Sequence, residues 1–171
     1  MARLFFALWP DPLAAEALAA LSLKLAEAAQ GKPVPADKIH LTLAFLGELA
    51  PERARHAQEA GAALVASVFE MVLDDVGSFR SARVAWAGAS RTPPKLAALQ
   101  RDLGEELRLR MFSPEDRPFV PHVTLARRIS KSVARAQMPP IAWKARELTL
   151  VRSETGTGRY VVLERWPLRR A

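Results

Sequence analysis

Two short stretches, far apart in the chain, share a pattern of residue types that could act on a phosphate. They are His40-Leu41-Thr42-Leu43 and His122-Val123-Thr124-Leu125. Side chains alternate along a β-strand, so in each stretch the histidine and the threonine would lie on one face and the two aliphatic residues on the other. We therefore expect two strands whose polar faces meet in a cleft and whose aliphatic faces are anchored in the core.

Such a cleft has the groups that displacement at phosphorus requires. The attacking and leaving oxygens lie roughly in line, so a base is needed on one side and an acid on the other. Two imidazoles can serve as both because the reference pKa of histidine is about 6.5, and threonine hydroxyls can donate hydrogen bonds to the non-bridging oxygens. The chain has no cysteine and no acidic cluster at metal-ligand spacing, so we expect neither a metal nor another cofactor. The residues alone do not decide which histidine is the acid.

Local patterns predict the elements that must position these residues. Alternating or apolar runs predict strands, and apolar residues at helical spacing after proline or N-cap signals predict helices. The expected strands cover residues 3–9, 39–46, 69–76, 83–87, 120–127, 145–152 and 159–166, and the expected helices cover residues 12–30, 51–67 and 93–107. This order, without a glycine-rich phosphate loop, favours an α+β fold with antiparallel sheets. The length predicts a single domain over residues 1–171.

Composition indicates the kind of partner and the location. The chain has 25 lysines and arginines against 18 acidic residues, and the resulting formal charge of +7 suits a polyanionic partner. No apolar run approaches the roughly 18 residues of a membrane span, and no signal-peptide pattern is present, so we expect a cytoplasmic protein without a membrane partner. No spare apolar helix face or heptad run stands out, so we expect a monomer without an obligate protein partner.

The residues around the two motifs resemble the paired signatures of the two-histidine (2H) phosphoesterase superfamily. They are Ile39-His-Leu-Thr-Leu-Ala-Phe-Leu-Gly47 and Arg117-Pro-Phe-Val-Pro-His-Val-Thr-Leu-Ala-Arg127. They look most like the RNA 2′,3′-cyclic phosphodiesterase branch, also called 2′-5′ RNA ligase. The resemblance, which extends to residues 3–8 and to the overall length, implies a bilobal α+β fold. In that fold two antiparallel sheets with pseudo-twofold symmetry line a central cleft, and the helices lie outside.

The resemblance also implies an activity and a role for each site residue. The activity is metal-independent hydrolysis of a terminal 2′,3′-cyclic phosphate to a 2′-phosphate, and relatives can also run the reverse reaction, joining RNA ends such as tRNA halves. The resemblance assigns His40 as proton donor and His122 as proton acceptor, with Thr42 and Thr124 beside them. It also assigns Arg127 to the phosphate. Because Arg127 lies five positions after His122, a bend or an early strand end must turn it to the same face.

Two residues of the proline-rich loop before the second motif are further candidates for substrate binding. Arg117 could contact the RNA backbone or brace the loop. Phe119 could stack on a base, as aromatic residues do in RNA recognition, or pack within the protein. The third histidine, His56, lies in a helix rich in Glu and Arg, and we expect it to be exposed and inactive.

Two other functions remain open from the sequence. The same histidines could act on a small cyclic phosphate or a 2′-5′ oligonucleotide, since the walls of the pocket decide the substrate. Alternatively, they could only contact phosphate in a non-catalytic basic RNA-binding module.

Overall fold

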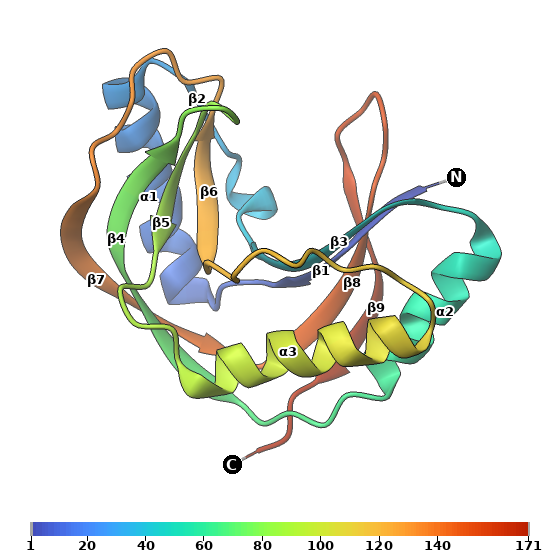
Figure 1. The fold of residues 1–171 in the computed structure, drawn as a ribbon. Coiled ribbons are helices and arrows are strands. Elements are labelled where there is room, and N and C mark those ends of the chain that lie inside the picture. Colours follow the sequence, from blue (N-terminus) through green and yellow to red (C-terminus); the bar gives the residue numbers. More distant parts are fainter. Residues whose placement is uncertain (1, 171) are drawn as a thin grey trace.

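The computed structural model describes residues 2–170, which form a mixed fold with a large antiparallel sheet (Figure 1). The helices are α1 (Pro12–Ala29), α2 (Pro51–Ala62) and α3 (Pro94–Leu109), and a short 3-10 helix covers Ala36–Lys38. The strands are β1 (Ala2–Leu8), β2 (Lys32–Pro33), β3 (Leu41–Leu49), β4 (Phe69–Phe79), β5 (Val84–Gly88), β6 (His122–Arg127), β7 (Ala136–Ala145), β8 (Glu147–Ser153) and β9 (Tyr160–Pro167). The predicted α+β fold class is confirmed.

The sheet consists of two halves that meet at one pair of residues. The path through it is β7-β4-β5-β6-β3-β1-β8-β9, with β2 paired to β6. Between β3 and β6, the ladder within residues 2–170 contains the pair Leu41–Val123 alone. On either side of this pair the two halves diverge into two lobes (Figure 1). We call β2, β4, β5, β6 and β7 the His122 lobe, and β1, β3, β8 and β9 the His40 lobe.

The helices cover the outer faces of the lobes. α1 packs on β6 and β7 of the His122 lobe, whereas α2 and α3 pack against each other and against the His40 lobe. The leucines of α3 at helical spacing are all buried, as predicted, and they are Leu96, Leu99, Leu103 and Leu107. Burial of one leucine stabilises a fold by about 1.5–3 kcal/mol, so this stripe fixes the position of α3. None of the helices within residues 2–170 is both long and apolar enough to cross a membrane.

The His40 lobe is also buried on the face that looks away from these helices. Phe5, Ala7 and Val151 form a small second cluster there, and Trp9, Tyr160 and Val162 pack against it. Phe5 and Ala7 alternate along β1 with residues of the main core, so β1 is apolar on both faces.

The strand β7 is one that the sequence patterns did not predict. It lies at the edge of the sheet and pairs with β4. Most of its residues are exposed, and its sequence shows no clear alternation of apolar and polar residues that would indicate a strand. It contains Pro139 and Pro140, which have no amide hydrogen to donate to a ladder and therefore suit an edge strand.

Several predicted boundaries also differ from the structure by one to five residues. β3 begins at Leu41, so His40 immediately precedes the strand. α2 ends at Ala62, five residues before the predicted end. β4 continues to Phe79, so the connection to β5 is residues 80–83 and the predicted hairpin connection at 77–80 is largely strand.

The end of α1 brings it close to the second motif. Gln30 takes the left-handed conformation (φ 52°), and the amide of Gly31 donates a hydrogen bond to the Ala26 carbonyl. A Cβ atom at Gly31 would lie 2.7 Å from the carbonyl oxygen of Arg127. Glycine is therefore needed here for a close approach to β6, and the helix stop is supplied by Gln30.

Candidate active site

The single pair between β3 and β6 brings the two motifs together. Leu41 lies opposite Val123, and both side chains are fully buried. The residues next to this pair face the other way, and in an antiparallel register each histidine lies across from the threonine of the other motif. These four residues are His40, Thr42, His122 and Thr124, and all are partly exposed. The polar sides of both motifs therefore share one face at the junction of the lobes.

Both imidazole rings are oriented by the same backbone contact. Nδ1 of His40 lies 2.7 Å from the Lys38 carbonyl oxygen, and Nδ1 of His122 lies 2.9 Å from the Val120 carbonyl oxygen. A carbonyl oxygen only accepts hydrogen bonds, so each Nδ1 carries the hydrogen and donates it. Nε2 is then the atom that gains or loses a proton in each ring. Nε2 of His40 lies 3.1 Å from Thr42 Oγ1, on the polar face.

A bulge in β6 turns Arg127 toward the same face. Alternate residues of β5 lie opposite His122, Thr124 and Arg127 in turn. Thr124 and Arg127 are three positions apart although their partners in β5 are two apart, so β6 contains one extra residue between them. As a result Leu125 and Ala126 are buried in succession, and the next side chain emerges on the polar face. This bulge is the bend that the sequence analysis required for Arg127.

Comparison with known protein families shows which family the chain belongs to. Residues 9–157 of the chain match the family model described as the 2′-5′ RNA ligase superfamily. The chain belongs to this superfamily. The resemblance seen in the two motifs is therefore confirmed.

Individual superfamily members agree over most of the chain. The protein named RNA 2′,3′-cyclic phosphodiesterase from Escherichia coli (strain K12) is 36% identical over 142 residues, which cover 81% of this chain and 80% of that protein. The protein of the same name from Thermus thermophilus is 32% identical over 185 residues, covering 98% of this chain and 90% of that protein. The crystal structure of E. coli LigT complexed with 3′-AMP matches with a TM-score of 0.85 at 34% identity and covers 98% of both chains.

In this 2′-5′ RNA ligase superfamily member the two histidines have different surroundings. The ring of His40 lies among three aromatic rings, those of Phe5, Trp9 and Tyr160, at centroid distances of 4.9, 5.2 and 5.5 Å. Beside His122 lies the ring of Phe79, which meets it edge-on at 5.1 Å. The aromatic rings beside His40 shield part of its ring from water.

This difference sets the protonation state of His40. Burial lowers the pKa of His40 to about 4, although the hydrogen bond to the Lys38 carbonyl raises it. The positive charges of Arg127 and His122 lower this pKa further. Near neutral pH His40 is therefore neutral in the free protein. The influence of Arg127 and His122 also shows that both groups act on His40 across the junction of the lobes.

The sequence analysis missed Phe45, which occupies in the first motif the place that Arg127 occupies in the second. The register between β1 and β3 shifts after Thr42, which leaves Leu43 as an extra residue, as in the β6 bulge. Phe45 therefore emerges on the face of His40 and is 71% exposed. A large exposed ring on the face of a candidate catalytic histidine suits stacking on a nucleobase. The signal was the equal offset, since both residues lie five positions after their histidine.

The structure does not bring the two loop candidates into this cluster. Arg117 is exposed and forms an ion pair of 2.6 Å with Glu115, which raises the pKa of the guanidinium. Phe119 is partly buried and packs against the main core. His56 is half-buried rather than exposed, and the guanidinium of Arg53, which donates to the Arg110 carbonyl, lies 3.2 Å from its Nδ1.

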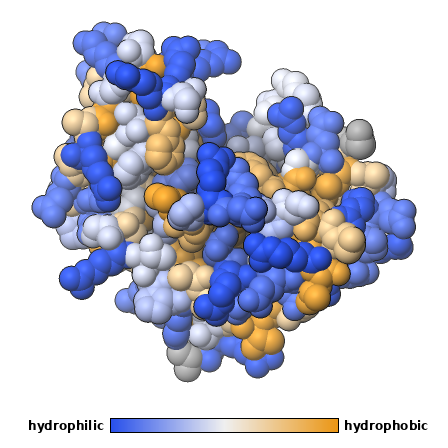
Figure 2. Space-filling model, viewed as in Figure 1, coloured by the Kyte–Doolittle hydropathy of each residue, from blue (hydrophilic) through white to orange (hydrophobic). Residues whose placement is uncertain are grey.

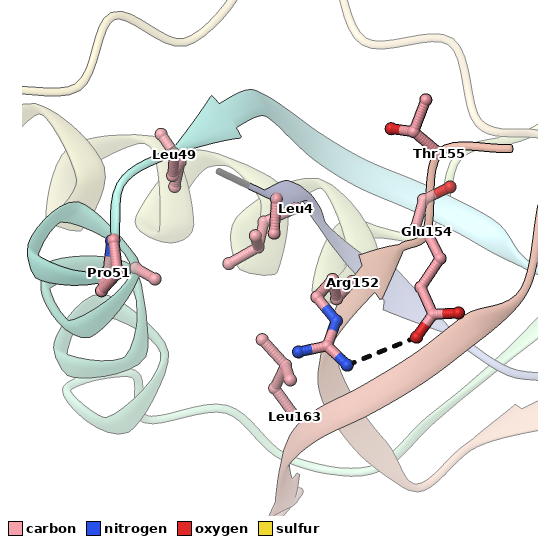
Figure 3. Close-up of a pocket in the computed structure, with 10 residues that line it drawn as sticks. Leu4, Leu49, Pro51, Arg152, Glu154, Thr155 and Leu163 are labelled. Atoms are coloured by element: carbon pink, nitrogen blue, oxygen red, sulfur yellow. Dashed lines mark ion pairs between the residues drawn. The ribbon is translucent and has the colours of Figure 1, made fainter.

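A separate cavity of about 580 Å³ lies on the other face of the His40 lobe. Its wall includes Leu4 and Leu163, and Figure 3 shows Arg152 beside it in an ion pair of 3.5 Å with Glu154. Leu4 precedes Phe5 in β1 and so points away from His40. This cavity is therefore distinct from the two-histidine site.

The described part of the chain, residues 2–170, contains no group of three or more His, Cys, Asp or Glu residues that could hold a metal ion.

Proposed function

We propose that this protein hydrolyses 2′,3′-cyclic phosphates at RNA ends to 2′-phosphates by metal-independent acid–base catalysis. The observation that carries the proposal is the common face of the two histidine–threonine pairs, with Arg127 turned toward it by the β6 bulge. The names of the relatives from E. coli and Thermus thermophilus, RNA 2′,3′-cyclic phosphodiesterase, support the same activity.

In the proposed reaction His122 Nε2 takes a proton from water, and the water oxygen forms a bond to phosphorus opposite the ribose O3′. The P–O3′ bond breaks, and His40 Nε2 gives its proton to the departing O3′. Thr42 and Thr124 donate hydrogen bonds to the non-bridging oxygens, and Arg127 supplies a positive charge to them. The products are a 2′-phosphate and a free 3′-hydroxyl.

The donor role requires a proton on His40, whose pKa is lowered to about 4 mainly by burial. A bound cyclic phosphate places a negative charge beside the ring and favours the imidazolium form. We therefore propose that His40 takes up a proton when the substrate binds. The Lys38 carbonyl supports this change, because Nδ1 donates to it in both protonation states.

Product analysis on a nucleoside 2′,3′-cyclic phosphate tests the proposed function. We expect a nucleoside 2′-monophosphate, formed at an unchanged rate in the presence of EDTA. A 3′-monophosphate would contradict the assignment of O3′ as the leaving oxygen. Loss of activity on chelation, restored by added metal, would contradict metal independence.

We further propose RNA ends such as those of tRNA halves as substrates and a cytoplasmic location. With the 5′-hydroxyl of a second RNA end in place of water, the same site would join the two ends through a 2′-5′ linkage: the P–O3′ bond breaks, His122 accepts the hydroxyl proton and His40 protonates O3′. The superfamily name supports this second activity. A monomer is sufficient for the proposed site, because all of its residues come from one chain.

A further inference from the structure

The end of the His122 lobe carries a group of arginines and lysines from three separate segments. They lie in β2, in the connection between β4 and β5, and in the stretch formed by the end of β6 and the residues that follow it. We call this group the basic tip, and its members are Lys32, Arg80, Arg83, Arg127, Arg128 and Lys131. All six are exposed. The end of this lobe, at the upper left in Figure 2, is predominantly hydrophilic on the face shown.

Contacts between these segments hold the basic tip together. Lys32 lies opposite Arg127 in the pairing of β2 with β6, so the two side chains share a face. Arg83 Nε donates a hydrogen bond of 3.1 Å to the Ile129 carbonyl, and the Lys131 amide donates to the Ala29 carbonyl at 2.9 Å. Figure 1 shows these segments gathered at the same end of the lobe. The positive charges are therefore close in space although they are distant in the sequence.

The positive charges of the basic tip are not neutralised within the described residues 2–170. None of its six side chains takes part in an ion pair there, and residues 76–101 and 117–146 contain no acidic residue. Asp75, which lies in β4 of this lobe, is paired with Arg135 at 2.9 Å.

In the His40 lobe, by contrast, several arginines form ion pairs with glutamates. Arg152 and Arg159 both pair with Glu154, and Arg165 pairs with Glu147. Within the described residues, unpaired positive charge is therefore concentrated at the basic tip of the lobe that carries His122.

The basic tip is continuous with the candidate active site through Arg127. This residue faces the two histidines by way of the β6 bulge and also lies beside Lys32 of the tip. A polyanion whose last phosphate lies between the histidines could therefore continue onto the tip. A small cyclic phosphate would end at Arg127 and would leave the other five cations without a partner.

We propose that the basic tip binds the backbone phosphates of the nucleotides that precede the cyclic phosphate, so that the preferred substrates are RNA chains and not mononucleotides. This inference rests on the proposed function. Its physical basis is the release of counterions when arginine and lysine neutralise phosphates. Each phosphate contacted on a single strand changes the slope of log K against log salt concentration by about −0.7.

The test compares two substrates that end in the same nucleotide. One is a nucleoside 2′,3′-cyclic phosphate, and the other is a short oligoribonucleotide with the same cyclic phosphate at its 3′ end. We expect kcat/KM to be at least about tenfold higher for the oligonucleotide at low salt, and the difference to shrink as the salt concentration rises. Equal kcat/KM values without a salt dependence would overturn the proposal and favour small cyclic phosphates.

A charge-reversal variant locates the effect. Arg80→Glu combined with Lys131→Glu changes two exposed side chains outside the catalytic cluster. We expect this variant to lose about tenfold or more in kcat/KM for the oligonucleotide, through KM, and to keep the wild-type rate on the mononucleotide. The matched control is Lys95→Glu with Lys144→Glu, two exposed cations beside a cavity at the start of α3. This control should hydrolyse both substrates like the wild type.

Three outcomes have different meanings. An oligonucleotide rate that is unchanged in the Arg80/Lys131 variant would overturn the role of the tip. An equal loss in the control variant would do the same, because net charge alone would then explain the preference. Failure of the wild type to hydrolyse either substrate would instead reject the proposed function, so the two failures are distinguishable.

Discussion

The indole ring of Trp9 packs against the imidazole of His40, with ring centroids 5.2 Å apart. The orientation of the indole is fixed by a residue from the other end of the chain, because Trp9 Nε1 donates a hydrogen bond of 2.9 Å to the hydroxyl of Thr149. That hydroxyl is fully buried and donates in turn to the Ala7 carbonyl at 2.9 Å. Thr149 therefore positions a ring that covers one of the two candidate catalytic histidines.

Removing this ring should change the titration of His40. Burial is the main cause of its lowered pKa, so Trp9→Ala should raise the pKa of His40 from about 4 toward the ordinary value for histidine. NMR titration of the histidine ring carbons measures this shift. The matched control is Phe79→Ala, which removes the ring beside His122 and should leave the His40 titration in place. A His40 pKa that stays near 4 in Trp9→Ala would show that the indole does not desolvate the ring.

The lowered pKa of His40 also predicts how stability depends on pH. Between the unfolded value of about 6.5 and the folded value of about 4, the unfolded chain binds more protons at this residue than the folded chain does. Above pH 6.5 this residue therefore does not lower the free energy of unfolding, and as the pH falls from about 6.5 to about 4 the free energy of unfolding decreases. At pH 4.5 the loss from this residue is about 2 kcal/mol relative to pH 7.5.

Urea unfolding of the wild type and of His40→Gln at both pH values measures this contribution. Glutamine does not titrate, so the variant should lose about 2 kcal/mol less than the wild type on acidification. Parallel losses in the two proteins would contradict a lowered pKa at His40. The comparison cancels the contributions of all other titrating groups that the substitution leaves unchanged.

Much of this arrangement could be predicted from local sequence patterns. The α+β class, the three helices and the polar and aliphatic sides of both motifs follow from periodicity, because each depends on neighbours within a few residues. The need for a bend before Arg127 also followed from strand alternation, and the β6 bulge supplies it. The extent of the domain over residues 1–171 and the roles of the site residues stay predictions.

What could not be predicted depends on the pairing of distant segments. The edge strand β7 has little alternation and two prolines, so no local signal indicates it. The aromatic surroundings of His40 combine residues from both ends of the chain, including Trp9 and Tyr160. Phe45 resembles a core residue in the sequence, and the bulge after Thr42 that exposes it is visible only in the register of β1 with β3.

Loss of Arg127 should weaken the hold on the phosphate. Arg127→Ala removes the positive charge on the polar face, and we expect kcat/KM for a nucleoside 2′,3′-cyclic phosphate to fall by about 10²-fold. Arg127→Lys should recover part of this loss, because lysine keeps the charge but not the two-pronged geometry of the guanidinium. Arg101→Ala, on the exposed surface of α3, is the control and should be unaffected. A normal rate in Arg127→Ala would remove this residue from the proposed site.

Phe45 should contribute through the base of the substrate. If its exposed ring stacks on a nucleobase, Phe45→Ala should raise KM for a nucleoside 2′,3′-cyclic phosphate by about tenfold, since base stacking contributes about 1–3 kcal/mol. The matched control is a substrate rather than a variant. Ribose 2′,3′-cyclic phosphate without a base should show the same KM with both proteins. Equal KM values for the nucleoside substrate would assign Phe45 to packing against Phe5 alone.

The roles of the two histidines can be separated with an altered leaving group. His40→Ala and His122→Ala should each lower the rate on the ordinary cyclic phosphate by at least about 10²-fold, whereas His56→Ala should keep it. Sulfur in place of O3′ departs as a thiolate, which needs no proton, so a general acid is dispensable for that substrate. If His40 is the donor, the defect of His40→Ala should shrink by at least about tenfold on the 3′-thio substrate, and the defect of His122→Ala should persist. The opposite pattern would make His40 the proton acceptor and His122 the donor. That assignment would also agree with a His40 that is neutral before the substrate binds, because a neutral imidazole can accept a proton.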